Sequence, residues 1–188
     1  MNFIKTDIEG VIIVEPRVFE DARGYFFESY NAAEFAANGI PNVFVQDNQS
    51  KSSQGVARGL HFQAPPFAQA KLVRCVVGEV LDIALDIRRG SPTYGQFQTV
   101  LLSADKHNQF FIPRGFAHGF VVLSPEAVFQ YKCDNYYSPA HDGGVNILDS
   151  EIGLNLEAFG HDLIVSEKDM KHRLLRDFDS PFELGVNC

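Results

Sequence analysis

The sequence contains no tryptophan, only three cysteines, and no apolar run near the roughly 20 residues that a membrane helix needs. Cys75, Cys133 and Cys188 are odd in number and lack metal-site spacing, so we expect reduced thiols. The N-terminus also lacks a signal-peptide pattern. These absences predict a soluble, cytoplasmic protein.

Positive charge is scarce, with 16 Lys and Arg against 24 Asp and Glu, a net charge of −8. This balance argues against nucleic acid or an anionic membrane as a partner, but a local cluster of cations can still bind a small anion. The 188 residues show no repeat or linker, so we expect one domain over 1–188. The 17 phenylalanines favour a β-rich core or a stacking pocket.

Short strand patterns separated by Gly, Pro and Ser fill most of the chain and indicate a mainly β sandwich or barrel. In 80–87, Leu and Ile alternate with Asp and Ala, which predicts a strand with one buried face. Short helices are expected after Asn31, with Glu34 completing a capping box, and after Ser166 in the C-terminal tail. The expected strands cover 11–14, 25–30, 43–48, 56–63, 71–77, 80–87, 96–102, 109–112, 120–123 and 128–133, with loops at 49–55 and 88–95.

Residues 56–63 carry Arg58 and His61 three positions apart, which a regular strand would place on opposite faces. Gly59 lies between them and is typical of a β-bulge, which would let both side chains reach one face. His61 is then either a hydrogen-bonded strand histidine or a general base, with Lys71 as an oxyanion stabiliser ten residues later.

Three further groups have both a structural and a functional interpretation. His118, between two expected strands, either satisfies a turn or faces a ligand. Tyr131, followed by Tyr136 and Tyr137, is either an amphipathic core-edge residue or an acid. Asp169 is either the acidic residue of a capping box or a functional carboxylate beside Lys168.

We expect no metal and no cofactor. A metal-binding barrel would show a His-x-His pair, but Phe62 and Gln63 follow His61. His107, His141, His161 and His172 have no ligand spacing, and the sequence contains no glycine-rich phosphate loop or Rossmann fingerprint.

Taken in order, these motifs resemble the dTDP-4-dehydrorhamnose 3,5-epimerase family. The resemblance implies a single-domain, cupin-type jelly roll with a few short helices, the last ones at the C-terminus. It spans nearly the whole chain and rests on the segments 21–30, 46–50, 58–63, 71–75, 112–120, 131–139 and 166–169.

The resemblance implies an epimerase that acts on a nucleotide-linked 4-keto-6-deoxyhexose without a cofactor. His61 would be the base, oriented by Asp169, Tyr131 the acid, and Lys71 the partner of the keto oxygen. Inversion needs a base and an acid on opposite walls, which fits this set. The substrate-binding residues implied are Arg23, Phe26, Glu28, Gln46, Asp47, Asn48, Arg58, His118, Tyr137, Asp142 and Lys168.

Within that set, Arg58, His118 and Lys168 would line the sugar and pyrophosphate, and Tyr137 would stack on the base. Gln46, Asp47 and Asn48 would hold the nucleotide. Arg23 and Glu28 would reach the neighbouring subunit's nucleotide, which implies a homodimer.

The sequence departs from the family pattern at two places. Asp142 aligns where Glu is more usual, and 147–150 replace a run that usually contains Trp. These changes leave the sugar, the nucleotide and the number of inverted carbons open. The alternatives are a mono-epimerase at C3 or C5, an epimerase of GDP- or CDP-linked deoxysugars or heptoses, and a non-catalytic sugar-nucleotide-binding cupin.

Overall fold

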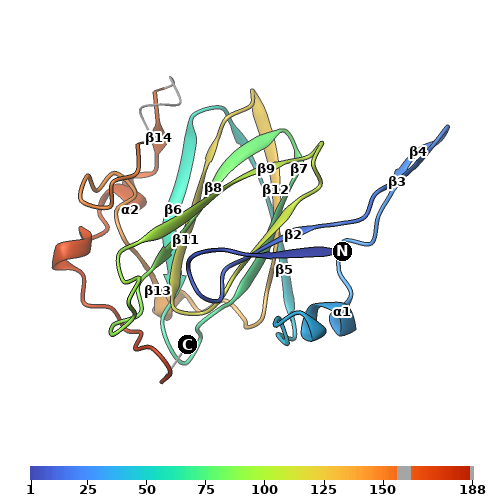
Figure 1. Cartoon of the computed structure of the whole chain (residues 1–188). Helices are drawn as coiled ribbons and strands as arrows, with labels where there is room; N and C mark the ends of the chain where they lie inside the picture. The colour runs from blue at the N-terminus through green and yellow to red at the C-terminus, as the bar shows by residue number, and fades with distance from the viewer. Residues whose placement is uncertain (156–161, 187–188) are drawn as a thin grey trace.

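Two facing, mostly antiparallel sheets make up the body of the computed structural model, which describes residues 1–155 and 162–186 (Figure 1). The first sheet has the order β1(Asn2–Lys5), β2(Ile12–Glu15), β10(Gln109–Ile112), β7(Lys71–Val77), β12(Glu126–Cys133) and β5(Gln46–Ser53). The second has the order β13(Asp142–Gly144), β6(Val56–Gln63), β11(Phe116–Val122), β8(Glu79–Asp86) and β9(Phe97–Ser103), with β14(Ile164–Val165) parallel to β6.

This arrangement confirms the predicted mainly β sandwich. His161 and Cys188 lie outside the described residues, while Cys75 and Cys133 are free and buried. Within the described residues, no helix is long and apolar enough to cross a membrane.

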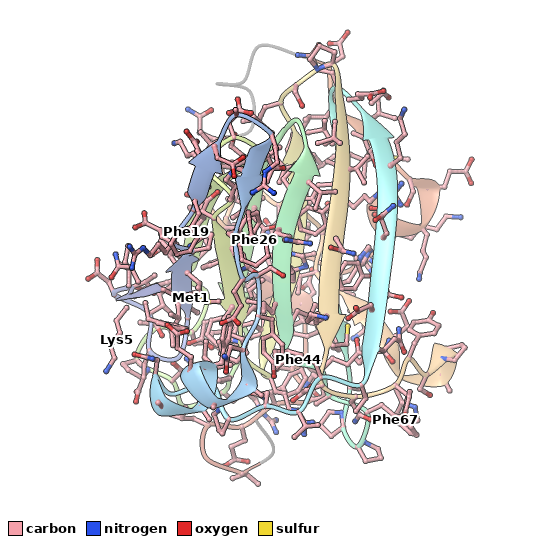
Figure 2. All side chains as sticks on the ribbon, turned by 90° about the vertical axis from the view of Figure 1, so that its right-hand side faces the viewer. Met1, Lys5, Phe19, Phe26, Phe44 and Phe67 are labelled. Carbon is pink, nitrogen blue, oxygen red and sulfur yellow. The ribbon has the colours of Figure 1, made fainter. Side chains whose placement is uncertain are left out.

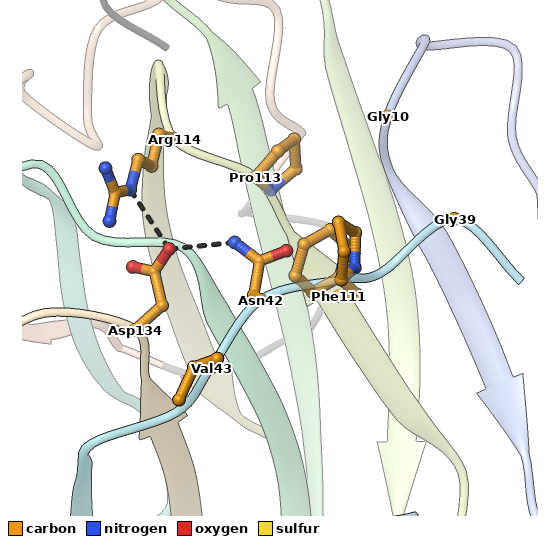
Figure 3. A pocket seen from close by; sticks show the side chains of 9 residues that line it. Gly10, Gly39, Asn42, Val43, Phe111, Pro113, Arg114 and Asp134 are labelled. Carbon is orange, nitrogen blue, oxygen red and sulfur yellow. Dashed lines mark hydrogen bonds and ion pairs between the residues drawn. The ribbon is translucent and has the colours of Figure 1, made fainter. Parts of the chain in front are cut away.

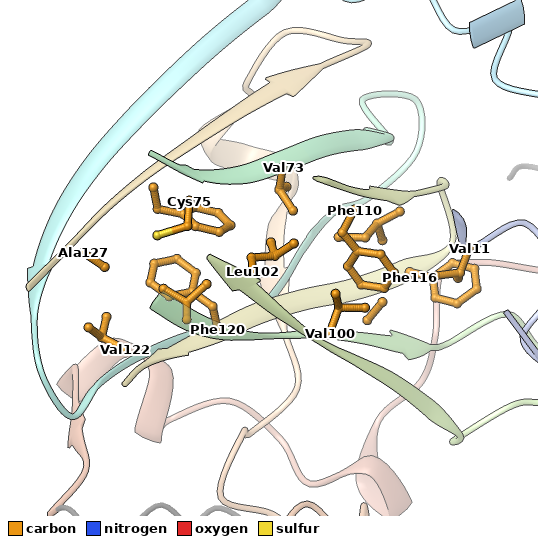
Figure 4. Packing of buried hydrophobic residues seen from close by; sticks show 14 of the residues in the cluster. Val11, Val73, Cys75, Val100, Leu102, Phe110, Phe116, Phe120, Val122 and Ala127 are labelled. Carbon is orange, nitrogen blue, oxygen red and sulfur yellow. The ribbon is translucent and has the colours of Figure 1, made fainter. Parts of the chain in front are cut away.

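The space between the sheets is filled by large apolar side chains from both (Figure 4). Phe110 and Phe129 come from the first sheet, and Phe116 and Phe120 from the second. The rings of Phe120 and Phe129 stack with their centroids 4.3 Å apart. The phenylalanine-rich composition is therefore used in the core, where aromatic side chains bury the most area.

Strand β8 corrects the expectation of one buried face, because both of its faces are buried. Ile83, Leu85 and neighbouring apolar residues pack in a separate cluster that includes Ile147, Ile152 and Phe182 of the C-terminal segment. The opposite face carries Asp82, which is fully buried. The C-terminal third of the chain thus covers the outside of the second sheet, which leaves a carboxylate inside the sandwich.

The two α-helices in the described part of the chain are short and begin at the predicted caps. α1(Ala32–Ala37) is capped by Asn31, whose Oδ1 accepts from two backbone N–H groups. Glu34 does not complete a capping box, because its carboxylate binds the N-terminal ammonium at 2.7 Å. α2(Glu167–Met170) is capped by Ser166, whose Oγ accepts from the Asp169 N–H at 3.1 Å. The tail adds the 3-10 turn Leu175–Asp177, and Pro139–His141 forms another before β13.

Several strand limits differ from expectation. β5 continues to Ser53 through the expected loop, and its polar side chains alternate between exposed and half-buried or buried, as suits an edge strand. β11 begins at Phe116 rather than at residue 120, and β1 was missed. The expected strand over 25–30 contracts to β4(Gly24–Phe26), which pairs only with β3(Phe19–Asp21).

The β3–β4 hairpin projects away from both sheets (Figure 1). All of its residues are exposed, including Phe19 and Phe26, which lie on the side of the molecule seen in Figure 2. Exposed aromatic residues on a projecting hairpin are a feature of interaction surfaces.

Candidate active site

A cavity of about 330 Å³ opens at one end of the sandwich. It is lined from both sheets, from the segment after β12 and from α2. Its lining residues are Gln46, Asn48, His61, Phe62, Gln63, Gln69, Lys71, Tyr131, Tyr137, Asp142 and Lys168.

A β-bulge at Gly59 sets the direction of the residues on β6. His61 pairs with His118 and Arg58 pairs with Phe120, so two β6 residues face the single residue between them on β11. Side chains normally alternate between the two faces of a strand, and the extra residue shifts this alternation by one position. Arg58 and His61, three residues apart, therefore lie on the same face. Gly59 has φ +116°, and a Cβ there would lie 2.6 Å from the His118 carbonyl oxygen, so only glycine fits.

His61 is held by Asp169, which comes from α2. The imidazole Nε2 lies 2.7 Å from Oδ1, and Oδ2 accepts from the Gly59 N–H at 3.3 Å. A carboxylate can only accept, so Nε2 carries the proton and Nδ1 is left as the basic atom. Burial lowers the pKa of His61 despite the hydrogen bond and charge of Asp169. A neutral imidazole with one nitrogen tethered is the form that a general base requires.

Asp169 remains ionised beside this histidine. Burial opposes the charge, but hydrogen bonds from His61 and Gly59 bring the pKa of Asp169 below its usual value, together with the positive charges that His61 and His172 carry once they are protonated at acidic pH.

Lys71 and Tyr131 lie on the first sheet, across the cavity from His61 on the second. The Lys71 Nζ is 5.9 Å from the centre of the Tyr131 ring, and this nitrogen has no hydrogen-bond or ion-pair partner among the described residues. Burial lowers the pKa of Lys71 against the charges of Cys133, Asp142 and Asp82. Burial also raises the pKa of Tyr131. The wall opposite His61 therefore carries an unpaired lysine side chain and a phenol that holds its proton.

Polar contacts organise the rim of the cavity. Asp142 accepts from Gln63 at 3.0 Å and also forms an ion pair with Lys168. Gln46 donates to Asn48 at 3.1 Å and accepts from the Tyr137 N–H at 3.1 Å. Amide, carboxylate and ammonium groups thus surround an exposed tyrosine at the entrance.

Asp47 and His118 do not line the cavity, contrary to expectation. Asp47 lies between Gln46 and Asn48 on β5, so its side chain faces the other side of the sheet, where it binds Lys132 at 3.0 Å. His118 is only 7% exposed, and its Nε2 contacts both oxygens of Asp82 at 2.9 and 3.0 Å.

The β3–β4 hairpin keeps Arg23 and Phe26 out of the cavity. Arg23 is tied to Asp21 at the hairpin turn, and both it and Phe26 line a separate open pocket of about 520 Å³. Glu28 follows the hairpin and is exposed. This chain alone therefore does not bring these three residues to His61.

Another open pocket, of about 550 Å³, is lined by residues whose polar contacts connect segments of the fold (Figure 3). Its carboxylate, Asp134, accepts from Asn42, Arg114 and the Ala70 N–H at 2.7 to 3.0 Å. Those contacts tie the chain after α1 to the end of β12.

One group in the described chain offers metal-ligand types, namely His61, Asp169 and His172, whose ligand atoms lie within 4.8 Å of one another. Two ligands bound at about 2.0–2.1 Å around tetrahedral zinc would lie roughly 3.3 Å apart. The 2.7 Å contact between His61 and Asp169 is shorter, so these atoms are arranged as a hydrogen-bonded pair.

Sequence reasoning missed Asp82 and His172. Asp82 was assigned to the exposed face of β8, and only the pairing of β8 with β11 brings it to His118. His172 was set aside because it lacks ligand spacing, but it follows Asp169 by three residues. That spacing in a predicted helix places two side chains on one face and was the available signal.

Comparison with known proteins identifies a family for this chain. The family model for dTDP-4-dehydrorhamnose 3,5-epimerase matches residues 5–177. A dTDP-4-dehydrorhamnose 3,5-epimerase of Shigella flexneri is 52% identical over 180 residues, covering 95% of this chain and 98% of that protein. The protein of the same name from Escherichia coli K12 is 53% identical over 170 residues, covering 90% and 91%.

A solved structure is also similar over most of the chain. The dTDP-6-deoxy-D-glucose-3,5-epimerase of Legionella pneumophila, in complex with dTDP-4-keto-L-rhamnose, superposes with a TM-score of 0.90 at 45% identity, covering 95% of this chain and 94% of that one. With the family model matching most of its length, the chain belongs to the dTDP-4-dehydrorhamnose 3,5-epimerase family.

Proposed function

We propose that this protein is an isomerase that inverts C3 and C5 of dTDP-4-dehydro-6-deoxy-D-glucose. The observation that supports this most directly is the placement of His61 with Asp169 on one wall of the cavity and of Lys71 with Tyr131 on the other. Family membership and relatives at about 50% identity support the same reaction.

The 4-keto group acidifies the C–H bonds at both flanking carbons. Nδ1 of His61 removes one proton, and the resulting imidazolium is stabilised by Asp169 through Nε2. The electron pair moves into the carbonyl and forms an enolate, whose oxygen is stabilised by the Lys71 ammonium. Tyr131 then gives a proton to the carbon from the opposite face, which inverts the centre. Proton exchange with solvent returns His61 to the neutral imidazole and Tyr131 to the phenol, and the same sequence at the second carbon then completes the reaction without redox chemistry.

The remaining polar residues recognise the nucleotide in this proposal. Arg58 and Lys168 bind the pyrophosphate, and Lys168 exchanges its ion pair with Asp142 for a phosphate oxygen. Gln46 and Asn48 hold the nucleotide, and the exposed ring of Tyr137 stacks on the base. His118 does not reach the substrate and lies behind the cavity, where it contacts Asp82. Asp47 faces away from the cavity and takes no part in binding.

The projecting β3–β4 hairpin supports a homodimer. Phe26 and Arg23 are exposed and distant from this chain's cavity, and Glu28 follows them. Across a two-fold interface they would complete the nucleotide site of the partner subunit.

Deuterium exchange tests the reaction directly. The protein is incubated in deuterated water with dTDP-, GDP- and CDP-linked 4-keto-6-deoxyhexoses, and label at C3 and C5 is followed by NMR. We expect label at both carbons with the dTDP sugar. Label at one carbon would indicate a mono-epimerase, and binding without exchange for every sugar would indicate a non-catalytic binder and contradict the proposal.

Two variants test the assigned roles in the same assay. His61→Ala is expected to abolish exchange at both carbons, by at least roughly a thousandfold. Tyr131→Phe is expected to retain exchange and lose inversion, because the phenol acts after deprotonation. Tyr136→Phe is the matched control, since Tyr136 is exposed and does not line the cavity. Equal and mild losses in the first two variants would refute these roles.

A further inference from the structure

The carboxylate that holds His61 has a second histidine beside it. His172 lies just beyond α2, and its Nε2 is 3.8 Å from Oδ1 of Asp169, the oxygen that already contacts His61. The two imidazole rings meet edge to face, with centroids 5.7 Å apart and an interplanar angle of 73°. Asp169 therefore lies between two histidines.

The backbone holds His172 in this place. Its N–H donates to the Asp169 carbonyl at 3.2 Å, which closes the turn after α2. The next residue, Arg173, forms a bridge with Val145, and its carbonyl accepts from the Asn146 N–H at 3.0 Å. The segment that carries His172 is thus fixed to the strand edge beside the cavity.

A glycine makes the space for the ring. Gly144 of β13 is the pairing partner of His61, so a side chain there would lie beside the imidazole of His61. A Cβ on Gly144 would be 2.5 Å from His172 Nε2 and 2.7 Å from the Leu60 carbonyl oxygen. The ring of His172 occupies the place that a side chain at position 144 would take.

The Nε2 of His172 is buried and has no hydrogen-bond partner within the described residues, where it is the one buried side-chain nitrogen or oxygen in this condition. Buried polar atoms are normally paired, so an unpaired one next to an ionised carboxylate needs an explanation. The charge of Asp169 favours the tautomer with hydrogen on Nε2, because that N–H then points at the carboxylate. Closing the 3.8 Å gap by about 1 Å would give a hydrogen bond of ordinary length.

We propose that His172 is a positioning residue that donates from Nε2 to Asp169 and so fixes the carboxylate and moderates the basicity of His61. A carboxylate that accepts from His172 as well as from His61 and Gly59 is a weaker acceptor for each donor. His61 is then less basic than it would be with Asp169 to itself. The assignment deepens the proposed function, on which its kinetic test rests.

The groups around His172 and His61 are consistent with a His172 that is neutral and donates through its N–H. His172 faces Asp169 and Lys168 from α2, Asp142 from β13 and His61 from β6, and burial lowers its pKa against the two carboxylates. His61 faces Asp169, Lys71 and Asp142 in addition to His172. Near neutral pH, His172 therefore acts through its N–H rather than through a positive charge.

The test compares donor-free with donor-bearing replacements. His172→Leu fills most of the ring volume without an N–H, and His172→Gln places an amide N–H near the position of Nε2 without titrating. We expect His172→Leu to raise the acid-limb pKa of kcat/KM by about half to one pH unit and to lower kcat several-fold. KM should stay within about twofold, because His172 does not line the cavity. His172→Gln should restore both values, and His172→Met is a second donor-free variant should leucine prevent folding.

A measurement without substrate separates this proposal from the proposed function. NMR titration of the ligand-free protein should show His172 as the Nε2–H tautomer, and the pKa of His61 should rise in His172→Leu and return in His172→Gln. An unchanged His61 titration, an Nδ1–H tautomer of His172, or a shift that Gln does not restore would overturn the role of His172. Failure of deuterium exchange in the wild type would refute the epimerase instead and leave the titration result standing.

Discussion

Two histidine–aspartate pairs lie side by side in this protein, and only one of them opens to the cavity. His61 and His118 are direct partners on β6 and β11, so their side chains share a face of the second sheet. The carboxylate of the first pair, Asp169, comes from α2, 108 positions along the chain. The carboxylate of the second, Asp82, comes from the neighbouring strand β8.

Their surroundings separate the two pairs. The His61 side chain is 32% exposed, while those of His118 and Asp82 are 9% and 0% exposed. Burial raises the pKa of Asp82 although His118 and Lys71 favour its charge, whereas the pKa of Asp169 is lowered overall. The same two residue types therefore form a partly exposed pair with an ionised carboxylate in one place and a fully buried pair in the other.

The largest difference is expected from replacing each aspartate by asparagine. In Asp169→Asn the negative charge that stabilises the His61 imidazolium is lost. The neutral amide can also donate to Nε2, which favours the tautomer with hydrogen on Nδ1 and leaves no basic atom there, so kcat should fall roughly a thousandfold. In Asp82→Asn one acceptor remains for His118, and kcat should fall less than about tenfold. Steady-state turnover of the dTDP sugar measures both. Equal losses would mean that the buried pair is as much part of the chemistry as the exposed one.

The bulge that joins the two pairs gives the next largest effect. In Gly59→Ala the new Cβ would clash with the His118 carbonyl oxygen, and the alanine would have to adopt a positive φ. The free energy of unfolding should therefore fall by about 3 kcal/mol. Gly39→Ala is the matched control, because Gly39 has φ +92° with open space around it, and about 1 kcal/mol is expected. Urea unfolding measures both. A similar loss of unfolding free energy at the two positions would show that β6 and β11 do not pack tightly at Gly59.

Local sequence patterns predicted the elements that build the cavity. Strands over 56–63 and 71–77, the caps at Asn31 and Ser166, and the bulge at Gly59 all follow from residue types and short spacings, and the structure has them. These features depend on interactions between near neighbours in the chain. The roles assigned to individual site residues stay predictions.

The features that the sequence did not predict depend on which segments of the chain cover which faces of the sheets. The alternation in β8 indicated one exposed face, but the C-terminal segment covers the apolar face and Asp82 points inward. The polar run 49–53 resembled a loop because an edge strand needs little apolar content. Asp47 and His118 were expected at the substrate because the family resemblance implied it. Strand parity and burial place both side chains elsewhere.

The smallest expected effect is a difference in how the two aspartates link stability to pH. Asp169 has a folded-state pKa below 3.8, so its stabilising contribution is present above that value and is lost as the pH falls through the folded pKa. Asp82 has a folded-state pKa above 3.8, so its contribution is present below that value and is lost as the pH rises through the folded pKa. One proton changes stability by at most about 1.4 kcal/mol per pH unit.

The stability of each asparagine variant relative to the wild type should therefore move in opposite directions with pH. As the pH rises from about 3, Asp169→Asn should lose stability relative to the wild type. Asp82→Asn should gain it over the range up to the folded pKa of Asp82. Free energies of unfolding from urea titrations at half-unit steps, taken where all three proteins are folded, measure both trends. Asp105→Asn serves as a reference, because the Asp105 carboxyl is exposed and has no hydrogen-bond or ion-pair partner among the described residues. Parallel trends for the two variants would show that both pairs sit in equivalent surroundings, and the contrast between the partly exposed pair and the buried pair would fail.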